Sequence, residues 1–421
     1  MAYRFVHTAD LHLDSPLRSL ALRDDALASL IGGATRDALR RIVDLCLEER
    51  VDALFIAGDL YDGDQTSMKT ARFLVEQLGR LNGAGIRVFI IRGNHDAMSK
   101  ITRELTLPAS VKVFGSKAEA ITIERGPGQI PVAVHGLSFR DPMAPQSLLA
   151  QYRPPVQGAI NIGLLHTSLG GSRGHDVYAP SSPAELSGTG FRYWALGHIH
   201  KRSVIEGACT IVMPGIPQGR DINEAGPKSA SLVSIADDGT VRVEERFTAL
   251  AEFARLSVDL AGVADQRGVL DAVERTLIQA RNAMKADHLV TRIELTGETP
   301  LAYGLRADAD LYENDIAARA GQLGNCWIDS MTIACLQPGE QQGEAGAANE
   351  LARLIRQDAH HSESYRVEIA RIAADLRGEL PAECRTIFGD GDAGLAVLVD
   401  EAIRDGTEIA IARLSVIGGA E

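Results

Sequence analysis

Apolar runs alternate with amphipathic helical patterns along the first half of the chain. The runs that we expect to form strands occupy residues 3–9, 52–58, 86–93, 111–115, 131–139, 159–167, 191–197, 209–215, 230–236 and 240–247. Helical spacing separates the first three runs, at 35–49 and again at 67–81, where Gly83 and Gly85 follow as stop signals. Strand–helix alternation followed by β-rich sequence predicts an α/β fold, a layered β-sandwich flanked by helices.

The pattern changes near Leu250. Residues 252–335 carry strand, helix, strand, helix and strand signals in turn, which predicts a small α+β domain. A stretch rich in Gly, Gln and Glu follows at 337–347 and is typical of a linker, and the remaining sequence is helical and acidic. We therefore predict three parts, at residues 1–250, 251–336 and 337–421.

Charge is distributed unevenly along the 421 residues. The net charge is −13, of which residues 337–421 carry −8. Nucleic-acid-binding modules are usually basic, so the overall charge argues weakly against a DNA substrate. Two metal cations in an acidic pocket would nevertheless reverse the sign of the local charge. Charge alone therefore leaves the substrate open.

The sequence also bears on the compartment of the protein. The N-terminal residues lack the basic segment and apolar run of a secretory signal, and no stretch approaches the roughly 18 apolar residues of a membrane span. The five cysteines are scattered and form no CxxC pair, so we expect buried thiols and no disulfide framework or zinc ribbon. We expect a cytoplasmic protein that does not enter the membrane.

Polar side chains repeatedly follow the ends of the apolar runs. In chain order they are Asp10, His12, Asp59, Asp62, Asn94, His95, Asp96, His166, His198 and His200. Binding groups gather at strand ends in layered α/β folds, because the loops there leave a rigid scaffold at one edge. We therefore expect these side chains to form a single site.

The residue types in this set suit divalent cations. Carboxylate, imidazole and amide oxygen are ligands for manganese, iron or zinc, and the lack of cysteine argues against a structural zinc site. In DxH and HxH, the intervening residue lets both ligands point to one side of an extended segment. One aspartate can bridge two cations, and two cations about 3.5–4 Å apart can hold a phosphate and generate a hydroxide for in-line attack.

The motifs DxH, GDxxD, GNHD, a lone His and GHxH, in this order, resemble the blocks of the calcineurin-like metallophosphoesterase superfamily over roughly residues 1–250. The resemblance implies a metallophosphoesterase fold that holds two divalent ions, Mn²⁺ foremost, with Fe²⁺, Zn²⁺ or Mg²⁺ as alternatives. It also implies the division of the ligands. Asp10, His12, Asp59 and His200 would hold one ion, and Asp59 would bridge to a second ion held by Asn94, His166 and His198.

The same resemblance implies the catalytic groups. His95 corresponds to the histidine that protonates the leaving oxygen or steadies the phosphate. Asp62 matches the acidic residue that, in some members, orients this histidine, in keeping with the general role of carboxylates behind functional histidines.

A narrower resemblance connects the segments FVHTADLHLDSP, LHTSLGG, YWALGHIH and PGIPQGRDINEAGPKSASLV to bacterial DNA repair exonucleases of the SbcD/YhaO kind. It implies DNA as the substrate and an SMC-like coiled-coil ATPase as the partner. The chain has no GxxxxGK[ST] phosphate loop, so such an ATPase would be a separate protein. Residues 251–336 occupy the position at which the family has a small capping domain. Asp14 occupies a position at which many SbcD relatives have glycine, and this difference indicates the YhaO-like branch.

Four other residues are candidates for lesser roles. Arg220 follows a motif-bearing strand and could bind a phosphate, or it could form a surface salt bridge. His175 lies in a Gly-rich loop and could contact substrate. His7 and His135 lie inside apolar strands, where a hydrogen-bonded core histidine is the simpler interpretation.

Three functions remain open from the sequence. The first is a DNA exonuclease or endonuclease in DNA repair, and the second is a phosphoesterase for a nucleotide or cyclic nucleotide. The third is a tether that binds DNA ends and has weak activity. A protein phosphatase fits less well, because GDLYDG lacks an Arg after its second Asp. The oligomeric state also remains open, with a homodimer as one option.

Overall fold

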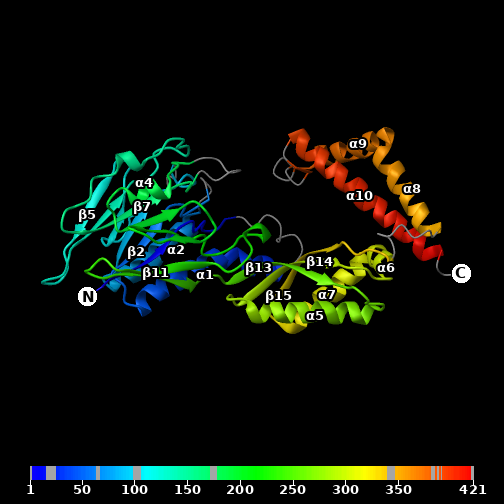
Figure 1. Ribbon diagram of the computed structural model, residues 1–421, viewed down its shortest axis with the longest axis horizontal. Helices are drawn as coiled ribbons and strands as arrows, with labels where there is room; N and C mark the ends of the chain where they lie inside the picture. The colour runs from blue at the N-terminus through cyan, green and yellow to red at the C-terminus, as the bar shows by residue number, and fades with distance from the viewer. Residues whose placement is uncertain are drawn as a thin grey trace. The chain divides into compact units, whose positions relative to one another are not determined.

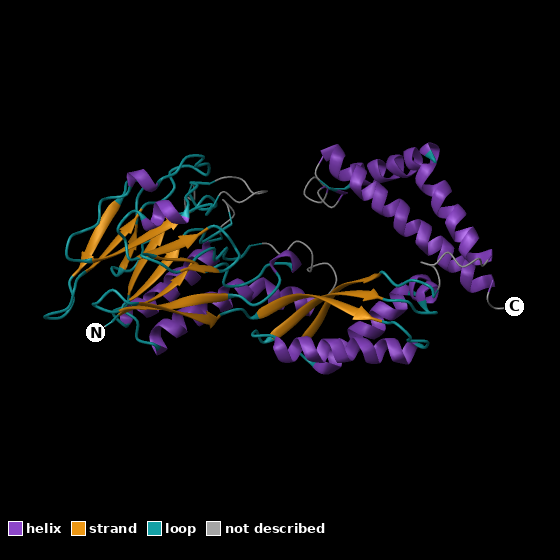
Figure 2. Ribbon diagram, viewed as in Figure 1, coloured by secondary structure: helices purple, strands orange, loops and turns teal. Residues whose placement is uncertain are grey.

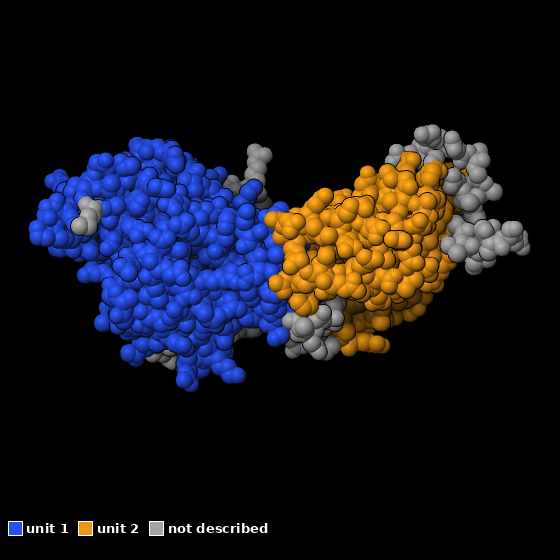
Figure 3. All heavy atoms as spheres, turned by 90° about the horizontal axis from the view of Figure 1, so that it is seen from below, with its two compact units in different colours: residues 1–254, 283–290 blue, residues 255–282, 291–421 orange. Residues whose placement is uncertain are grey.

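The computed structural model describes residues 2–15, 25–62, 67–97, 106–170, 178–338, 347–380, 385, 388–389 and 391–418. The chain divides into two compact units, one of residues 1–254 and 283–290, the other of residues 255–282 and 291–421 (Figure 3). The second unit contains most of the predicted α+β part together with the helical C-terminal part. The three-part division therefore stays a prediction.

The first unit contains two six-stranded sheets (Figures 1 and 2). One sheet has the order β12-β11-β1-β2-β3-β4, and its strands are Val241–Phe247, Ser229–Ile235, Tyr3–Thr8, Ala53–Ala57, Arg87–Ile91 and Val111–Val113. The strands β1 to β4 are parallel, whereas β11 pairs antiparallel with both β1 and β12.

The other sheet has the order β5-β6-β7-β8-β10-β9. Its strands are Glu119–Ile123, Val132–Gly136, Ile160–His166, Tyr193–Gly197, Thr210–Met213 and Ser203–Ile205. The four central strands β6, β7, β8 and β10 are parallel, and both edge strands are antiparallel to their neighbours. Each sheet thus has a parallel middle, so that neighbouring strands end at the same edge.

Alternating side chains on these strands build separate cores. Phe5 and Phe55 lie between the two sheets, in a cluster that includes Tyr193 from the second sheet. Their neighbours Val6 and Leu54 face the opposite side, where they pack with apolar residues of two helices. Strands buried on both faces read as continuous apolar runs, which is why the sequence pattern identified them.

The helices of the first unit follow from the same pattern. They are α1 (Asp25–Glu48), α2 (Met68–Gly83) and the short α4 (Pro183–Ser187), with 3₁₀ turns at Leu149–Gln151 and Ile222–Glu224. The helix α2 begins after Ser67, whose hydroxyl accepts a hydrogen bond from the Thr70 amide, as expected of an N-cap residue. It ends at Gly83, as the stop signal predicted.

The predicted α/β fold is confirmed: all ten predicted strands are present, and the C-terminal segment is helical. The sequence interpretation missed β5 and β9. Both are edge strands with partly exposed side chains, and β9 has only three residues, so neither shows a long apolar run. No described helix combines the length and the apolar character that a membrane span requires.

The strands β13 (Ala251–Asp259), β14 (His288–Thr296) and β15 (Cys326–Ile333) form a three-stranded sheet in that order. The helices α5 (Gln266–Ala283), α6 (Ala302–Ala307) and α7 (Ala309–Leu323) lie between these strands in the sequence, as the pattern over 252–335 predicted. Cys326 and Cys335 are buried, as are the other described cysteines, Cys46 and Cys209.

Three further helices complete the second unit, α8 (Ala347–His361), α9 (Glu363–Glu379) and α10 (Gly391–Gly418). The long α10 joins them. Its Ile411 packs with Ala352 of α8 and Tyr303 of α6, and its Val399 packs with Ala373 of α9. The C-terminal helices therefore share one small apolar core with α6 and form a second one among themselves.

A close contact between β7 and β8 gives a test of the first unit. Gly163 lies opposite Trp194, and a Cβ atom at position 163 would lie 2.3 Å from a carbon of the indole ring. Because Trp194 is fully buried, Gly163→Ala should destabilise the fold by about 1–3 kcal/mol, as overpacking does. Urea unfolding followed by circular dichroism measures the change.

Gly79→Ala is the matched control. Gly79 lies inside α2 with open space around its Cα, so alanine should stabilise the protein by about 0.5–1 kcal/mol. Equal stability of the Gly163→Ala variant and the unmodified protein would contradict the packing described for this strand pair.

Candidate metal centre

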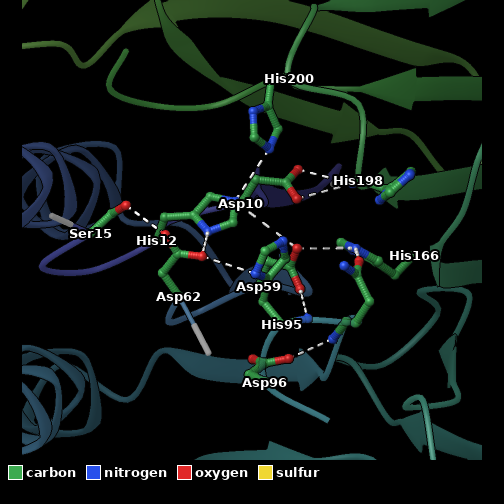
Figure 4. A network of polar contacts seen from close by, with 12 residues as sticks. Asp10, His12, Ser15, Asp59, Asp62, His95, Asp96, His166, His198 and His200 are labelled. Carbon is green, nitrogen blue, oxygen red and sulfur yellow. Dashed lines mark hydrogen bonds and ion pairs between the residues drawn. The ribbon is translucent and has the colours of Figure 1, made fainter. Parts of the chain in front are cut away.

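The polar residues predicted to form one site do lie together, at the carboxyl ends of parallel strands (Figure 4). Three of these strands, β1, β2 and β3, belong to one sheet, and β7 and β8 belong to the other. The loops after β1 and β2 are joined by main-chain hydrogen bonds, from the Asp10 amide to the Gly58 carbonyl (3.0 Å) and from the His12 amide to the Asp59 carbonyl (3.1 Å). These bonds set Asp10 and Asp59 beside each other.

The backbone of these loops is unusual. Asp10, His12, Asp59 and His198 all have positive φ angles, of 53°, 41°, 51° and 102°. This region costs an L-residue roughly 1–2 kcal/mol, and such strain collects at functional sites, where the surrounding structure enforces it. All four residues stand in the loops that follow β1, β2 and β8.

Asp10 is fully buried and its carboxylate has a main-chain partner. The amide of His198, in the other sheet, donates to both carboxylate oxygens, at 3.0 and 3.1 Å. This contact ties the DxH loop to the GHIH loop. It leaves the carboxylate with unused lone pairs, which a cation can take.

His166 has a defined orientation at the end of β7. Its Nδ1 lies 2.9 Å from the Ala57 carbonyl oxygen, so Nδ1 carries the proton and donates to that oxygen. Its Nε2 atom faces the Asn94 side-chain oxygen at 3.0 Å and the Asp59 Oδ2 atom at 3.4 Å. Three ligand atoms thus converge around one point.

His12 and His200 make a second convergence. Their Nε2 atoms are 3.2 Å apart, and His12 Nε2 lies 4.0 Å from Asp59 Oδ2. Ligand atoms of Asp10, His12 and His200 all lie within 4.8 Å of one another, and so do those of Asp10, Asp59 and His166. Asp59 Oδ2 therefore lies between the two histidines His12 and His166, where a bridging ligand would stand.

His198 lies at the edge of this cluster. Its ring centroid is 5.2 Å from that of His166. Among the described residues, it is not part of a group whose ligand atoms converge within 4.8 Å. The structure therefore brings the seven predicted ligands to one region. Five of them form the two convergent groups, Asn94 contacts His166, and His198 lies beside them.

Two glycines are required by the close approach of these groups. A Cβ atom on Gly58 would lie 2.3 Å from His166 Nδ1, and one on Gly93 would lie 2.2 Å from Asp59 Oδ1. Gly58 also has φ +101°, which few other residues adopt. The glycines of the GD and GNHD motifs thus make room for the ligands beside them.

Burial controls the charge of the cluster. It raises the pKa of Asp10 to about 6 and lowers the pKa of His12 and of His198 to about 3. Burial would lower the pKa of His166 as well, but the nearby Asp59 and Asp10 carboxylates outweigh it and raise that pKa to about 9. The neutral imidazoles of His12 and His198, beside buried carboxylates, form a set that suits divalent cations.

His95 and Asp62 form a pair next to this cluster. His95 Nδ1 lies 2.9 Å from Asp62 Oδ1, and the Ser15 hydroxyl donates to Asp62 Oδ2 at 2.7 Å. The hydrogen bond with Asp62 raises the pKa of His95, and the same bond lowers the pKa of Asp62. The carboxylate fixes the proton on Nδ1 and leaves Nε2 of His95 for other contacts.

Arg220 lies at the same site, held by Glu224. Its Nη2 atom is 2.7 Å from Glu224 Oε1, and its Nη1 atom is 3.7 Å from Asp62 Oδ2. Glu224 also contacts His200. The other predicted substrate-binding residue, His175, lies outside the described residues.

The sequence interpretation left two structural roles unassigned. Asp96 is buried and accepts hydrogen bonds from the Gly93 amide at 2.6 Å and the Leu60 amide at 3.0 Å, so it joins the GNHD and GDLYD loops. Asp14, at φ 58°, binds Arg36 of α1 and the Thr70 hydroxyl of α2. Its positive φ is a conformation that glycine adopts readily, whereas its carboxylate anchors the loop to both helices.

The core histidines behave as predicted. His7 lies between the Tyr193 hydroxyl and the Leu196 carbonyl, each 3.0 Å from one of its ring nitrogens. His135 Nε2 lies 2.8 Å from the Asn161 side-chain oxygen. Both rings are buried, and their contacts are with structural partners.

Comparison with known proteins identifies the family. The model of calcineurin-like phosphoesterases matches residues 3–202, and that of the middle domain of metallophosphoesterase YhaO matches residues 253–336. Metallophosphoesterase YhaO of Bacillus subtilis is 32% identical over 297 residues, which cover 70% of this chain and 72% of that protein. The chain belongs to the calcineurin-like phosphoesterase family. The resemblance expected from the motifs is confirmed, and this calcineurin-like phosphoesterase is a hydrolase of a family that binds divalent metals.

Two further relatives have narrower matches. The DNA double-strand break repair protein Mre11 of Aeropyrum pernix is 26% identical over 291 residues, covering 65% of this chain and 67% of that protein. The SbcD component of the nuclease SbcCD of Rhodobacter capsulatus is 32% identical over 146 residues, covering 33% of this chain and 31% of that component. This calcineurin-like phosphoesterase is therefore similar to proteins named for DNA repair and for nuclease activity.

The position of Asp59 in the cluster gives a direct test. Because its carboxylate lies between His12 and His166, Asp59→Ala should abolish binding of a pair of ions rather than of one. Metal analysis by inductively coupled plasma mass spectrometry, after dialysis against Mn²⁺, measures the number of ions per chain.

Asp237→Ala is the control, because Asp237 pairs with Arg125 in the same unit and lies outside the metal cluster. It should bind as many ions as the unmodified chain. Retention of two ions by Asp59→Ala would show that Asp59 is not the bridging ligand.

Proposed function

We propose that this phosphoesterase is a two-metal phosphodiesterase that hydrolyses DNA in DNA repair, with Mn²⁺ as its most suitable metal. Asp10, His12, Asp59 and His200 would hold one ion, and Asp59, Asn94, His166 and His198 the other. The observation that carries the proposal is the position of Asp59 Oδ2, 4.0 Å from His12 Nε2 and 3.4 Å from His166 Nε2. A single carboxylate can serve both ions from there.

Two bound cations would supply a water nucleophile of lowered pKa and positive charge to hold the phosphate. The chain's own residues would do the rest. His95 carries its proton on Nδ1 toward Asp62, and its raised pKa favours the protonated ring. A protonated His95 is suited to donate a proton from Nε2 to the leaving oxygen, or to hold a phosphate oxygen by a charged hydrogen bond.

Arg220 adds a second positive group. Its guanidinium is only partly exposed, and Glu224 fixes its Nε and Nη2 atoms, which leaves Nη1 directed toward the Asp62 side of the site. A planar guanidinium held in this way is suited to a non-bridging phosphate oxygen. We assign Arg220 to substrate binding on this ground.

A cavity lies next to the predicted metal ligands, and its size favours a substrate larger than a small phosphate monoester. It has a volume of about 940 Å³ and is lined by Asn94, His95, His198 and His200 on the metal side. Lys201, Arg202 and Lys228 line it as well and bring positive charge beside the acidic cluster. Such a cavity has room for the nucleotide units that flank a scissile phosphate, and its cations suit their phosphates.

The relatives support the same substrate. One is named for DNA double-strand break repair and another for nuclease activity. The latter is one component of a larger nuclease, SbcCD, which supports a partner protein here as well. We propose a separate SMC-like coiled-coil ATPase as that partner.

The proposed activity predicts Mn²⁺-dependent digestion of end-labelled DNA by the purified chain. His95→Ala should retain its metal ions and fold but lose about 10²–10⁴-fold in rate, the usual contribution of a general acid or base. Gel analysis of the labelled products measures the rate. His361→Ala, a change of an exposed histidine in α8, is the control and should digest DNA at the original rate.

Digestion products also separate the competing functions. If the metal-loaded chain hydrolysed a cyclic nucleotide and left DNA intact, the small-molecule phosphoesterase would replace the nuclease. Tight binding to DNA ends without digestion would favour the third function, a tether that binds DNA ends and has weak activity.

The Asp62–His95 pair predicts a change in the pH profile. The hydrogen bond that His95 Nδ1 donates to Asp62 raises the pKa of His95, so the protonated ring persists to higher pH. Asp62→Asn should therefore shift the alkaline limb of kcat/KM to lower pH, as measured on a chromogenic phosphodiester. Ser15→Ala is the control: it keeps the Asp62–His95 pair and should leave the alkaline limb of kcat/KM in place. An alkaline limb that does not shift in Asp62→Asn would show that Asp62 does not act on His95 as proposed.

A further inference from the structure

Glu224 connects a predicted metal ligand to a predicted substrate-binding residue. It ends the 3₁₀ turn Ile222–Glu224, in the segment between β10 and β11. Its Oε1 atom lies 2.7 Å from His200 Nδ1 and 2.7 Å from Arg220 Nη2. Its Oε2 atom accepts a hydrogen bond from the Arg220 amide at 2.7 Å.

This carboxylate is placed to fix one state of the His200 ring. An ionised carboxylate has lone pairs and no proton, so the short contact requires a proton on His200 Nδ1. The Nε2 lone pair is then left for the cluster, where it faces His12 Nε2 at 3.2 Å.

The side chain of Glu224 is also restrained. Only 12% of it is exposed, and Arg220 contacts it through both its guanidinium and its main-chain amide. Asp221 begins the same turn and accepts a hydrogen bond from the Asn223 amide, which fixes the backbone before Glu224. The carboxylate therefore reaches His200 from a rigid turn.

Resting on the metal set of the proposed function, we propose that Glu224 is a positioning residue that holds His200 with Nε2 toward the metal ions. Carboxylates behind a histidine ligand fix its tautomer and the orientation of its ring. Glu224 acts in this way on His200. The same carboxylate also holds the Arg220 guanidinium near Asp62. One acidic side chain thus couples metal affinity to the placement of the phosphate-binding guanidinium.

Glu224 has two proposed functions, to orient His200 and to hold Arg220. Metal binding measured without substrate separates them, because only the first acts on a metal ligand. Isothermal titration of the metal-free full chain with Mn²⁺ should show that Glu224→Ala weakens affinity by about 10–100-fold, the usual loss for such a partner. Glu224→Gln keeps one oxygen acceptor and should lose less. Arg220→Ala should lose less affinity than Glu224→Ala, because the main-chain amide at position 220 still donates to Glu224 Oε2 and the His200 contact remains.

Glu49→Gln is the matched control. Glu49 also pairs with arginines, Arg4 and Arg246, but it directly follows α1 and contacts no predicted ligand. The affinity of this variant for Mn²⁺ should equal that of the unmodified chain. Circular dichroism of each metal-free variant establishes that it is folded.

Three results would overturn the proposal. The first is an unchanged Mn²⁺ affinity in folded Glu224→Ala. The second is a loss of Mn²⁺ affinity in Arg220→Ala as large as that in Glu224→Ala. The third applies if Glu224→Ala does not fold, and is an unchanged Mn²⁺ affinity in Glu224→Gln. Because the titration uses no substrate, a failure of the nuclease activity leaves its outcome unaffected. Failure of the unmodified chain to bind Mn²⁺ would instead remove the metal set itself, and this proposal with it.

Discussion

Two buried carboxylates, Asp10 and Asp59, lie side by side at the strand ends, and their mutual repulsion constrains the whole site. Buried like charges are costly unless positive groups lie close to them. In the chain, His166 is the nearest source of such charge, and the carboxylates raise its pKa to about 9. One imidazolium offsets part of the repulsion, and divalent cations would offset the remainder far more strongly.

The architecture is arranged around this constraint. Each of the two sheets contributes parallel strands that end at the site, and a hydrogen bond from the His198 amide to Asp10 links their loops. Glycines at 58 and 93 let the carboxylates and His166 approach closely, and Asp96 ties the two loops that carry those glycines. The strain of the positive φ angles at Asp10 and Asp59 is sustained by these contacts.

Much of this was predictable from the sequence. Fully apolar runs marked strands that are buried on both faces, such as β2 and β7, and polar residues after them marked the site. Edge strands such as β5 carry partly exposed side chains, so their pattern does not differ from that of a loop. Glu224 was missed because its contact with His200 joins segments 24 residues apart, and no periodic pattern reports such a pairing. The left-handed backbone of Asp14 was hidden for the same reason, since its support comes from two helices.

In the proposed function, one carboxylate, that of Asp59, bridges two ions. Anomalous diffraction at the manganese edge, from crystals of the full chain grown with Mn²⁺, tests it most directly. We expect two peaks about 3.5–4 Å apart, the spacing of two-metal sites, with Asp59 in contact with both. A single peak, or two peaks of which only one touches Asp59, would contradict it.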